Sequence, residues 1–148
     1  MNILQKKLTI FYYSVFILAV LLAVGGYFLN KNGLIVTNKS FIDVFKSILI
    51  VYMLIIIPLS LKIFSTKVKK NAQIEDENEK FAKYLFLAKI RIVLISIIFL
   101  TGIIAFYIIN ENDYLYIAGI GAVVLFFCLP TKARIENDLF NEQLIINS

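Results

Sequence analysis

Four long apolar runs dominate the sequence, and they constrain the fold more than any other feature. They are Leu8–Leu29, Phe41–Leu61, Ile92–Ile109 and Tyr114–Pro130. A helix needs about 20 apolar residues to cross the roughly 30 Å hydrocarbon core of a bilayer. The first two runs reach that length, and flanking residues such as Leu87 and Ile90 can extend the third. Because backbone polar groups in lipid must be bonded within their own segment, these runs predict membrane-spanning helices.

The composition agrees with membrane helices. Of the 148 residues 60% are hydrophobic, and a soluble domain of this size could not hide that many apolar side chains from water. We therefore predict an all-α, polytopic membrane protein with a single transmembrane domain, a four-helix bundle, over residues 1–148. Its four helices run antiparallel, with a helical hairpin at 62–91 between the second and third spans and a tail at 131–148.

The first run also has features of a signal peptide. Lys6 and Lys7 precede it, and Ala23-Val24-Gly25 offers a small-x-small cleavage site. The run is long for a signal peptide, and the chain continues with further apolar runs instead of a soluble domain. We therefore expect the first span to be retained.

The basic residues predict how the chain is threaded. Of its 15 Lys and Arg residues, twelve fall near the two ends or between the second and third runs. Four spans place these segments on one side of the membrane, and loops rich in Lys and Arg stay in the cytoplasm. We predict a multi-pass protein of the cell (inner) membrane with both termini and the hairpin in the cytoplasm. The net charge of +5 beside apolar runs indicates anionic lipid headgroups, and not nucleic acid, as the partner at that face.

Most tyrosines lie near the ends of the runs, where their amphipathic rings favour the headgroup level. Those near the predicted cytoplasmic boundary are Tyr12, Tyr13 and Tyr84, and those near the outer boundary are Tyr27, Tyr107, Tyr114 and Tyr116. This distribution agrees with the predicted threading.

The polar interval Lys67–Arg91 joins the second and third runs. It contains no Gly or Pro, and its lysines up to Lys70 are followed by acids from Glu75 onward. Because cations suit a helix C-terminus and anions an N-terminus, the second helix is predicted to end near Lys70 and the third to start near Glu75. Asn71 is the predicted left-handed residue of the turn. The pattern favours a solvated connector, and the alternative is a docking site for a partner protein or anionic lipid.

Short polar motifs mark the ends of the predicted helices. Ser40 and Asp43 fit a capping pattern at the start of the second span, with Lys46 three residues after Asp43. This pattern favours a helix cap over an ion ligand for Asp43. Farther along the chain, Pro130 closes the fourth span, and Thr131 is expected to cap a weak, surface-lying helix in the tail.

Small residues recur in the apolar runs at helical spacing, where they let helix backbones approach closely. They are Ala19, Ala23 and Gly26 in the first run, Gly102 and Ala105 in the third, and Ala118, Gly121 and Ala122 in the fourth. Packing within the bundle is the favoured interpretation, and a seam with a partner or a second copy is the alternative.

Groups that carry chemistry are scarce. The sequence has no His and one Cys, Cys128, and no ionisable Asp, Glu, Lys or Arg lies deep in a predicted span. We expect no catalytic residues, no cofactor and no metal site, because no nucleophile–base set, phosphate loop or metal motif is present. The deep polar residues Tyr52, Ser96 and Thr101 are expected to bond to a neighbouring helix or to their own backbone.

The segment LPTKARIENDLF at 129–140, together with the charged hairpin, resembles small, mostly uncharacterised bacterial four-span membrane proteins. The resemblance implies an architecture for the whole chain and no activity. We expect a non-enzymatic integral membrane protein that acts through helix–helix or hairpin contacts. It would be a small subunit of a membrane assembly, a homo-oligomer, or an immunity-type protein that blocks a membrane-active toxin. The alternative is a small carrier or pore-forming protein, as a monomer or an oligomer.

Overall fold

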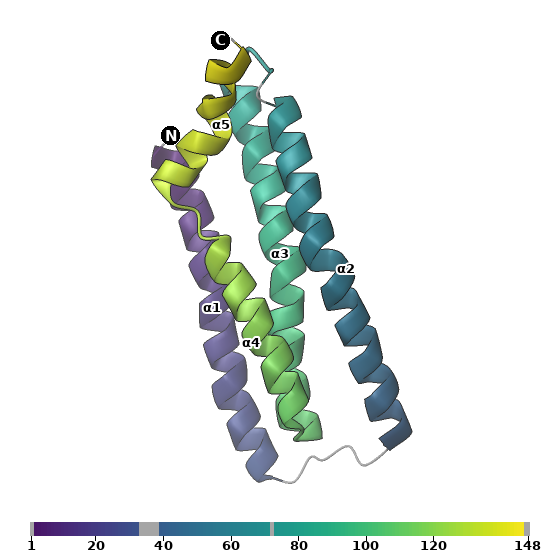
Figure 1. The fold of residues 1–148 in the computed structure, drawn as a ribbon. Helices are drawn as coiled ribbons and strands as arrows, with labels where there is room; N and C mark the ends of the chain where they lie inside the picture. Colours follow the sequence, from purple (N-terminus) through teal and green to yellow (C-terminus); the bar gives the residue numbers. More distant parts are fainter. Residues whose placement is uncertain (1, 33–38, 72, 147–148) are drawn as a thin grey trace.

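Five α-helices make up the protein in the computed structural model, which describes residues 2–32, 39–71 and 73–146, the last six by their backbone alone (Figure 1). The helices are α1 (Asn2–Lys31), α2 (Lys39–Asn71), α3 (Glu77–Ile109), α4 (Asn112–Phe127) and α5 (Lys132–Ile146). No strand occurs in these ranges, and the predicted all-α class is confirmed.

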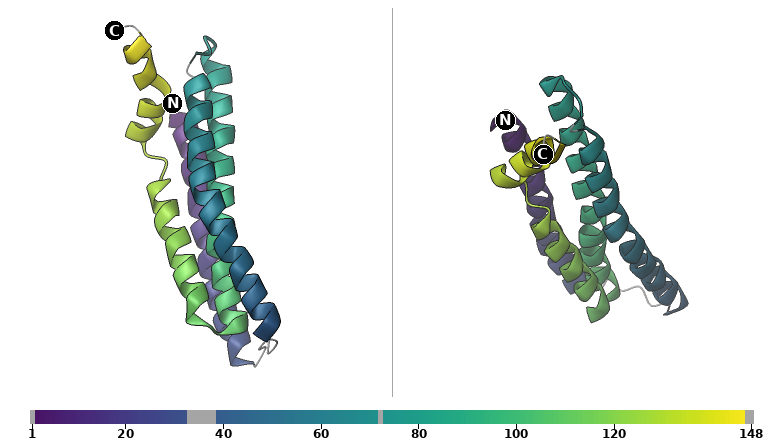
Figure 2. Two further views of the ribbon diagram at one scale, coloured as in Figure 1. Left: turned by 45° about the vertical axis from the view of Figure 1, so that its right-hand side comes forward. Right: turned by 45° about the horizontal axis from the view of Figure 1, so that its top comes forward.

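Helices α1 to α4 run side by side in alternating directions, and α3 is the central one (Figures 1 and 2). It packs against α1, α2 and α4, whereas α4 touches α2 only lightly. The start of α1, the turn between α2 and α3, and α5 all lie at one end of the molecule, which we call the hairpin end. The turn between α3 and α4 lies at the opposite end.

Three helices, α1, α2 and α3, are each long and apolar enough to cross a membrane. They contain the first three predicted spans. The fourth prediction was displaced toward the C-terminus, because α4 has 16 residues, begins at Asn112 and ends at Phe127 instead of Pro130. At 1.5 Å per residue it covers about 24 Å, less than the hydrocarbon core. Only together with Lys132–Phe140, from which it is bent by 66°, is α4 long and apolar enough to cross a membrane.

The turn at the hairpin end differs in detail from the prediction. Helix α2 ends at Asn71, which is still helical, and α3 begins at Glu77, two residues later than predicted. Asp76 caps α3, because its carboxylate accepts a hydrogen bond of 3.0 Å from the backbone N–H of Asn78. The left-handed residue predicted at Asn71 is found instead at Asn110, with φ 60°, where it ends α3 and allows a tight turn into α4.

Two other predicted helix ends can be compared with the structure. Helix α2 begins at Lys39, so Ser40 lies inside its first turn and the predicted cap there is wrong; the preceding Asn38 lies outside the described residues. The predicted cap of the tail helix is confirmed, because the Thr131 hydroxyl accepts a hydrogen bond of 3.4 Å from the backbone N–H of Arg134. Pro130 follows the end of α4 closely, where it prevents the helix from continuing.

Helices α3 and α4 approach each other so closely that glycine is needed at two contacts. A Cβ atom on Gly102 would lie 2.9 Å from the Cβ atom of Ala118, and one on Gly121 would lie 3.0 Å from the backbone nitrogen of Phe99. The small residues of these two helices therefore serve packing within the chain, as the sequence favoured.

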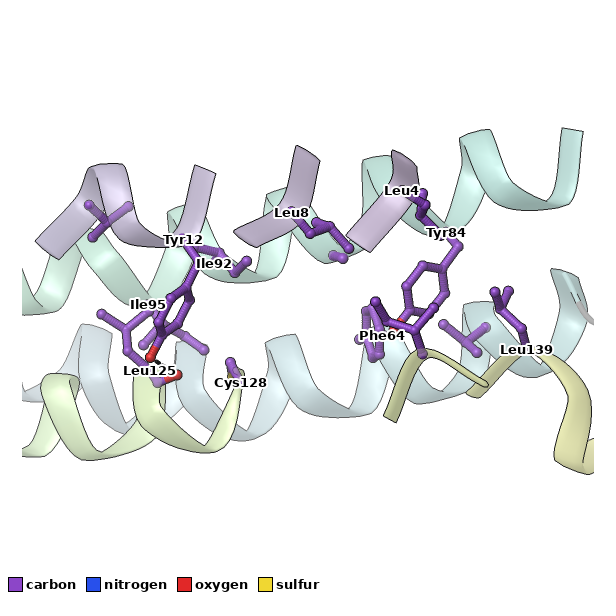
Figure 3. Close-up of a cluster of buried hydrophobic side chains, with 14 residues drawn as sticks. Leu4, Leu8, Tyr12, Phe64, Tyr84, Ile92, Ile95, Leu125, Cys128 and Leu139 are labelled. Atoms are coloured by element: carbon purple, nitrogen blue, oxygen red, sulfur yellow. Dashed lines mark hydrogen bonds between the residues drawn. The ribbon is translucent and has the colours of Figure 1, made fainter. Parts of the chain in front are cut away.

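Two buried tyrosines link helices that otherwise touch little. The hydroxyl of Tyr12 on α1 donates to the carbonyl oxygen of Leu125 on α4 at 3.0 Å (Figure 3). At the opposite end, the hydroxyl of Tyr114 on α4 donates to the carbonyl oxygen of Ile42 on α2 at 3.1 Å. Both rings are buried, so neither is the headgroup anchor that its position in the sequence predicted.

Candidate functional site

The tail helix α5 folds back over the hairpin end instead of lying loosely on a surface. Ile135 and Leu139 are each only 1% exposed, and they join one apolar cluster with residues of the other four helices. Figure 3 shows Leu139 close to Phe64 of α2 and Tyr84 of α3. The prediction of a weak surface helix was wrong, because the apolar side of α5 finds the hairpin as a partner.

A hydrogen bond fixes α5 to the hairpin. The hydroxyl of Tyr84 donates to the carboxylate of Asp138 at 3.0 Å. Burial of the ring raises the pKa of Tyr84, and the negative charge of Asp138 raises it further, so the hydroxyl keeps the proton that it donates. Close by, the ammonium of Lys80 lies 5.3 Å from the ring centre of Phe140 on α5. The hairpin is therefore packed on the side that faces α5, which the connector interpretation did not anticipate.

Arg91 is the most unusual side chain at this end. It lies on the buried side of α3 with only 8% of its surface exposed. Its guanidinium carbon is 3.7 Å from the ring centre of Phe64, and its Nε atom is buried without a hydrogen-bond partner among the described residues. No carboxylate in that part of the chain forms an ion pair with it. The buried position of Arg91 was not predicted, because the sequence places Arg91 as the last residue of a solvated hairpin.

A groove follows the contact between α2 and α3 at the hairpin end. Its deeper part, next to the apolar spans, has mainly apolar walls and contains Arg91; it is lined by Ser60, Ile63, Phe64, Leu87, Ile90, Arg91 and Leu94. Its outer part combines apolar walls with charged side chains, and is lined by Lys67, Asn71, Glu79, Ala82, Lys83, Phe86 and Leu87. Leu87 belongs to both parts, so the two form one continuous, amphipathic surface.

The outer part of the groove combines charge with an exposed aromatic ring. Lys83 pairs with Glu79 at 2.6 Å, four residues before it on α3. Phe86 has 65% of its surface exposed. Aromatic rings are enriched in protein contact surfaces, so the exposed ring of Phe86 makes this part of the groove a candidate contact surface.

At the opposite end, a second charged cluster joins α2 to the turn before α4. The ammonium of Lys46 lies 2.7 Å from a carboxylate oxygen of Glu111 and 2.8 Å from one of Asp113. The sequence associated Lys46 with Asp43 instead. Within the described ranges Asp43 forms no ion pair of its own. The cluster lies at this end of the molecule, next to the buried ring of Tyr114.

Ser96 and Cys128 are each bonded or packed within the protein. The Ser96 hydroxyl donates to the carbonyl oxygen of Val93 on its own helix at 2.9 Å, as expected. Cys128 is 1% exposed and packs in the cluster at the hairpin end. Among the residues that the structure describes, no group of three or more His, Cys, Asp or Glu side chains could hold a metal ion.

Comparisons with known proteins add no relative: no family model matches the chain, and no curated protein or solved structure matches it. The fold therefore defines the class by itself. The chain has the features of an all-α, multi-pass membrane protein with three helices able to span a bilayer, or four if α4 and the first part of α5 count as one bent span. Its most distinctive site is the groove at the hairpin end, with Arg91 at its base.

Proposed function

We propose that this is a non-enzymatic integral membrane protein that acts through contacts of its hairpin end. It would serve as a small subunit of a membrane assembly or as an immunity-type protein against a membrane-active toxin. In this proposal the protein lies in the cell inner membrane with four spans. Both termini and the hairpin end lie in the cytoplasm, because the segments there carry most of the basic residues.

The observation that carries the proposal is the amphipathic groove between α2 and α3. Its outer part presents Phe86, exposed over 65% of its surface, beside the ion pair of Lys83 with Glu79. Packing of α5 behind the hairpin, through Tyr84 and Asp138, holds this surface in a fixed shape before a partner arrives. A preformed surface loses less conformational entropy on binding than a mobile connector would.

The packed interior supports a contact role over transport by a single copy. Ile92, Ile95 and Ile98 of the central helix are at most 1% exposed, and they fill the middle of the bundle with apolar atoms. A carrier or pore needs polar groups along a path through the bilayer. A path of that kind would have to form between copies of the protein.

Affinity capture from membranes tests the proposal. We expect tagged protein, extracted in mild detergent after crosslinking in intact cells, to retain a protein partner. Phe86→Ser should lose that partner while the protein remains in the membrane. The matched control, Phe126→Ser, removes an equally exposed ring from α4, at 67%, and should retain the partner. Ion or solute flux through liposomes that contain only this protein would contradict the contact role and favour the carrier.

A further inference from the structure

The guanidinium of Arg91 lies among apolar side chains and forms no ion pair with a carboxylate in the part of the chain that the structure describes. Its Nε atom is buried and has no hydrogen-bond partner within the described ranges, and Phe64 covers its face. A buried cation is costly unless it is paired and its N–H groups are hydrogen-bonded, and a ring face compensates only part of that cost. The side chain therefore has donors available for an anionic ligand.

The position of Arg91 selects the kind of anion. It is the last residue of the predicted cytoplasmic hairpin and directly precedes the apolar run of α3, and it lines the groove together with Ile90 and Leu94. Ile63 and Ile90 leave about two fifths of their surfaces exposed, at 43% and 40%, so the apolar walls of the groove face outward. A ligand there meets a cation at its head and apolar walls along its length. Lys67, farther along the same groove, supplies a second cation.

We propose that the groove between α2 and α3 binds one anionic phospholipid, with its phosphate on the guanidinium of Arg91. One acyl chain lies along Ile63, Ile90 and Leu94 toward the middle of the membrane, and the rest of the headgroup extends toward Lys67. Arg favours phosphate because its planar fork can donate two parallel hydrogen bonds. The lipid site adjoins the contact surface around Phe86, because Lys67 lines the same outer part of the groove, and it requires membrane insertion but not the proposed partner.

Lipid binding to delipidated protein, measured by native mass spectrometry, tests this site. Phosphatidylglycerol and phosphatidylcholine are titrated separately, and inorganic phosphate is titrated in a third series. We expect phosphatidylglycerol to bind roughly tenfold or more tightly than phosphatidylcholine, because both lipids carry the phosphate but the choline ammonium of phosphatidylcholine cancels its charge and is repelled by Arg91 and Lys67. Inorganic phosphate should not compete at millimolar concentration, because it lacks the apolar chain.

Three variants locate the lipid. Arg91→Gln should reduce the preference for phosphatidylglycerol to about that of an uncharged site, and Arg91→Lys should restore only part of it, because an ammonium lacks the planar fork. Lys62→Gln removes the same charge from an exposed position on α2 outside the groove, and it should retain the preference. Ile63→Trp keeps Arg91 but fills the groove, and it should weaken phosphatidylglycerol binding.

Several results would overturn the proposed lipid site. Equal preferences in Arg91→Gln and Lys62→Gln would overturn the site, because the attraction would then be that of the whole basic surface. Wild-type protein without a preference, or displacement of the lipid by inorganic phosphate, would also overturn it. If Arg91→Gln does not fold, as judged by its helical circular dichroism, Ile63→Trp decides: retained binding in that variant excludes the groove.

Discussion

The hydroxyl of Tyr84 on α3 donates a hydrogen bond to the carboxylate of Asp138 on α5, 54 residues farther along the chain and 3.0 Å away. This bond connects the tail helix to the hairpin at a point where the ring of Tyr84 is almost fully buried. The ends of α2 and α3 that project from the apolar spans therefore pack together with α5.

Removal of this bond should loosen the tail helix. Tyr84→Phe keeps the ring and deletes the hydroxyl, and we expect α5 docking to weaken by about 1.5–3 kcal/mol, the usual net value of a hydrogen bond to a charged group. Amide hydrogen exchange in α5 should then be faster by roughly tenfold or more, since protection follows the free energy of local opening. Tyr13→Phe, at an exposed ring on α1, is the matched control. Unchanged exchange in α5 of Tyr84→Phe would show that the bond does not hold the helix.

Close packing of α3 on α4 gives a prediction with an internal control. Gly102→Ala places a methyl group 2.9 Å from the Cβ atom of Ala118, so the helices must move apart, at a cost of about 1–3 kcal/mol. Gly119→Ala, on α4, meets no atom within 4 Å, and it should be neutral or stabilising by up to about 1 kcal/mol because alanine favours helix. Unfolding in detergent measures both variants. Equal stability of the two would mean that the helices are not in this close contact.

Two charged residues at the opposite end, Lys46 and Asp43, should contribute differently to stability. Lys46→Gln removes the ion pairs with Glu111 and Asp113, and we expect a lower unfolding temperature in detergent. The loss should shrink at high salt, which screens such pairs. Asp43→Asn should have little effect, because Asp43 has no ion pair among the described residues. A large loss in Asp43→Asn with normal folding would instead favour an ion ligand at this position.

Threading can be tested by single cysteines in a Cys128→Ala background. A membrane-impermeant maleimide should label cysteines at Asn32 and Asn112 in intact cells, and should label those at Asn71 and Lys132 only after the cells are opened. The reason is the concentration of basic residues at the hairpin end. Labelling of the Asn71 position in intact cells would reverse the orientation and place the groove outside the cell.

The sequence was sufficient for the helices because the apolar runs leave the backbone no alternative in lipid. Of the local caps, that of Thr131 was predicted, whereas the cap predicted at Ser40 was wrong and that of Asp76 was missed. Three contacts between residues far apart in the sequence were not predicted. Nothing near Arg91 in the sequence indicates that Phe64 covers it, and nothing near Ile135 indicates that the hairpin receives it. Lys46 was assigned to the nearest acid, Asp43, whereas its partners are 65 and 67 residues away.

The central claim is that the hairpin end, and not the lipid-facing side of the spans, contacts a protein partner. Site-specific photocrosslinking in intact cells tests it most directly, with the reactive residue placed at Phe86 or at Val20. The two positions are similarly exposed, at 65% and 61%, but Val20 lies within the first apolar run. We expect a discrete protein adduct from the Phe86 position and none from the Val20 position. An adduct from Val20 alone would place the contact on the spans, and no adduct from Phe86 would contradict the proposed role of the hairpin end.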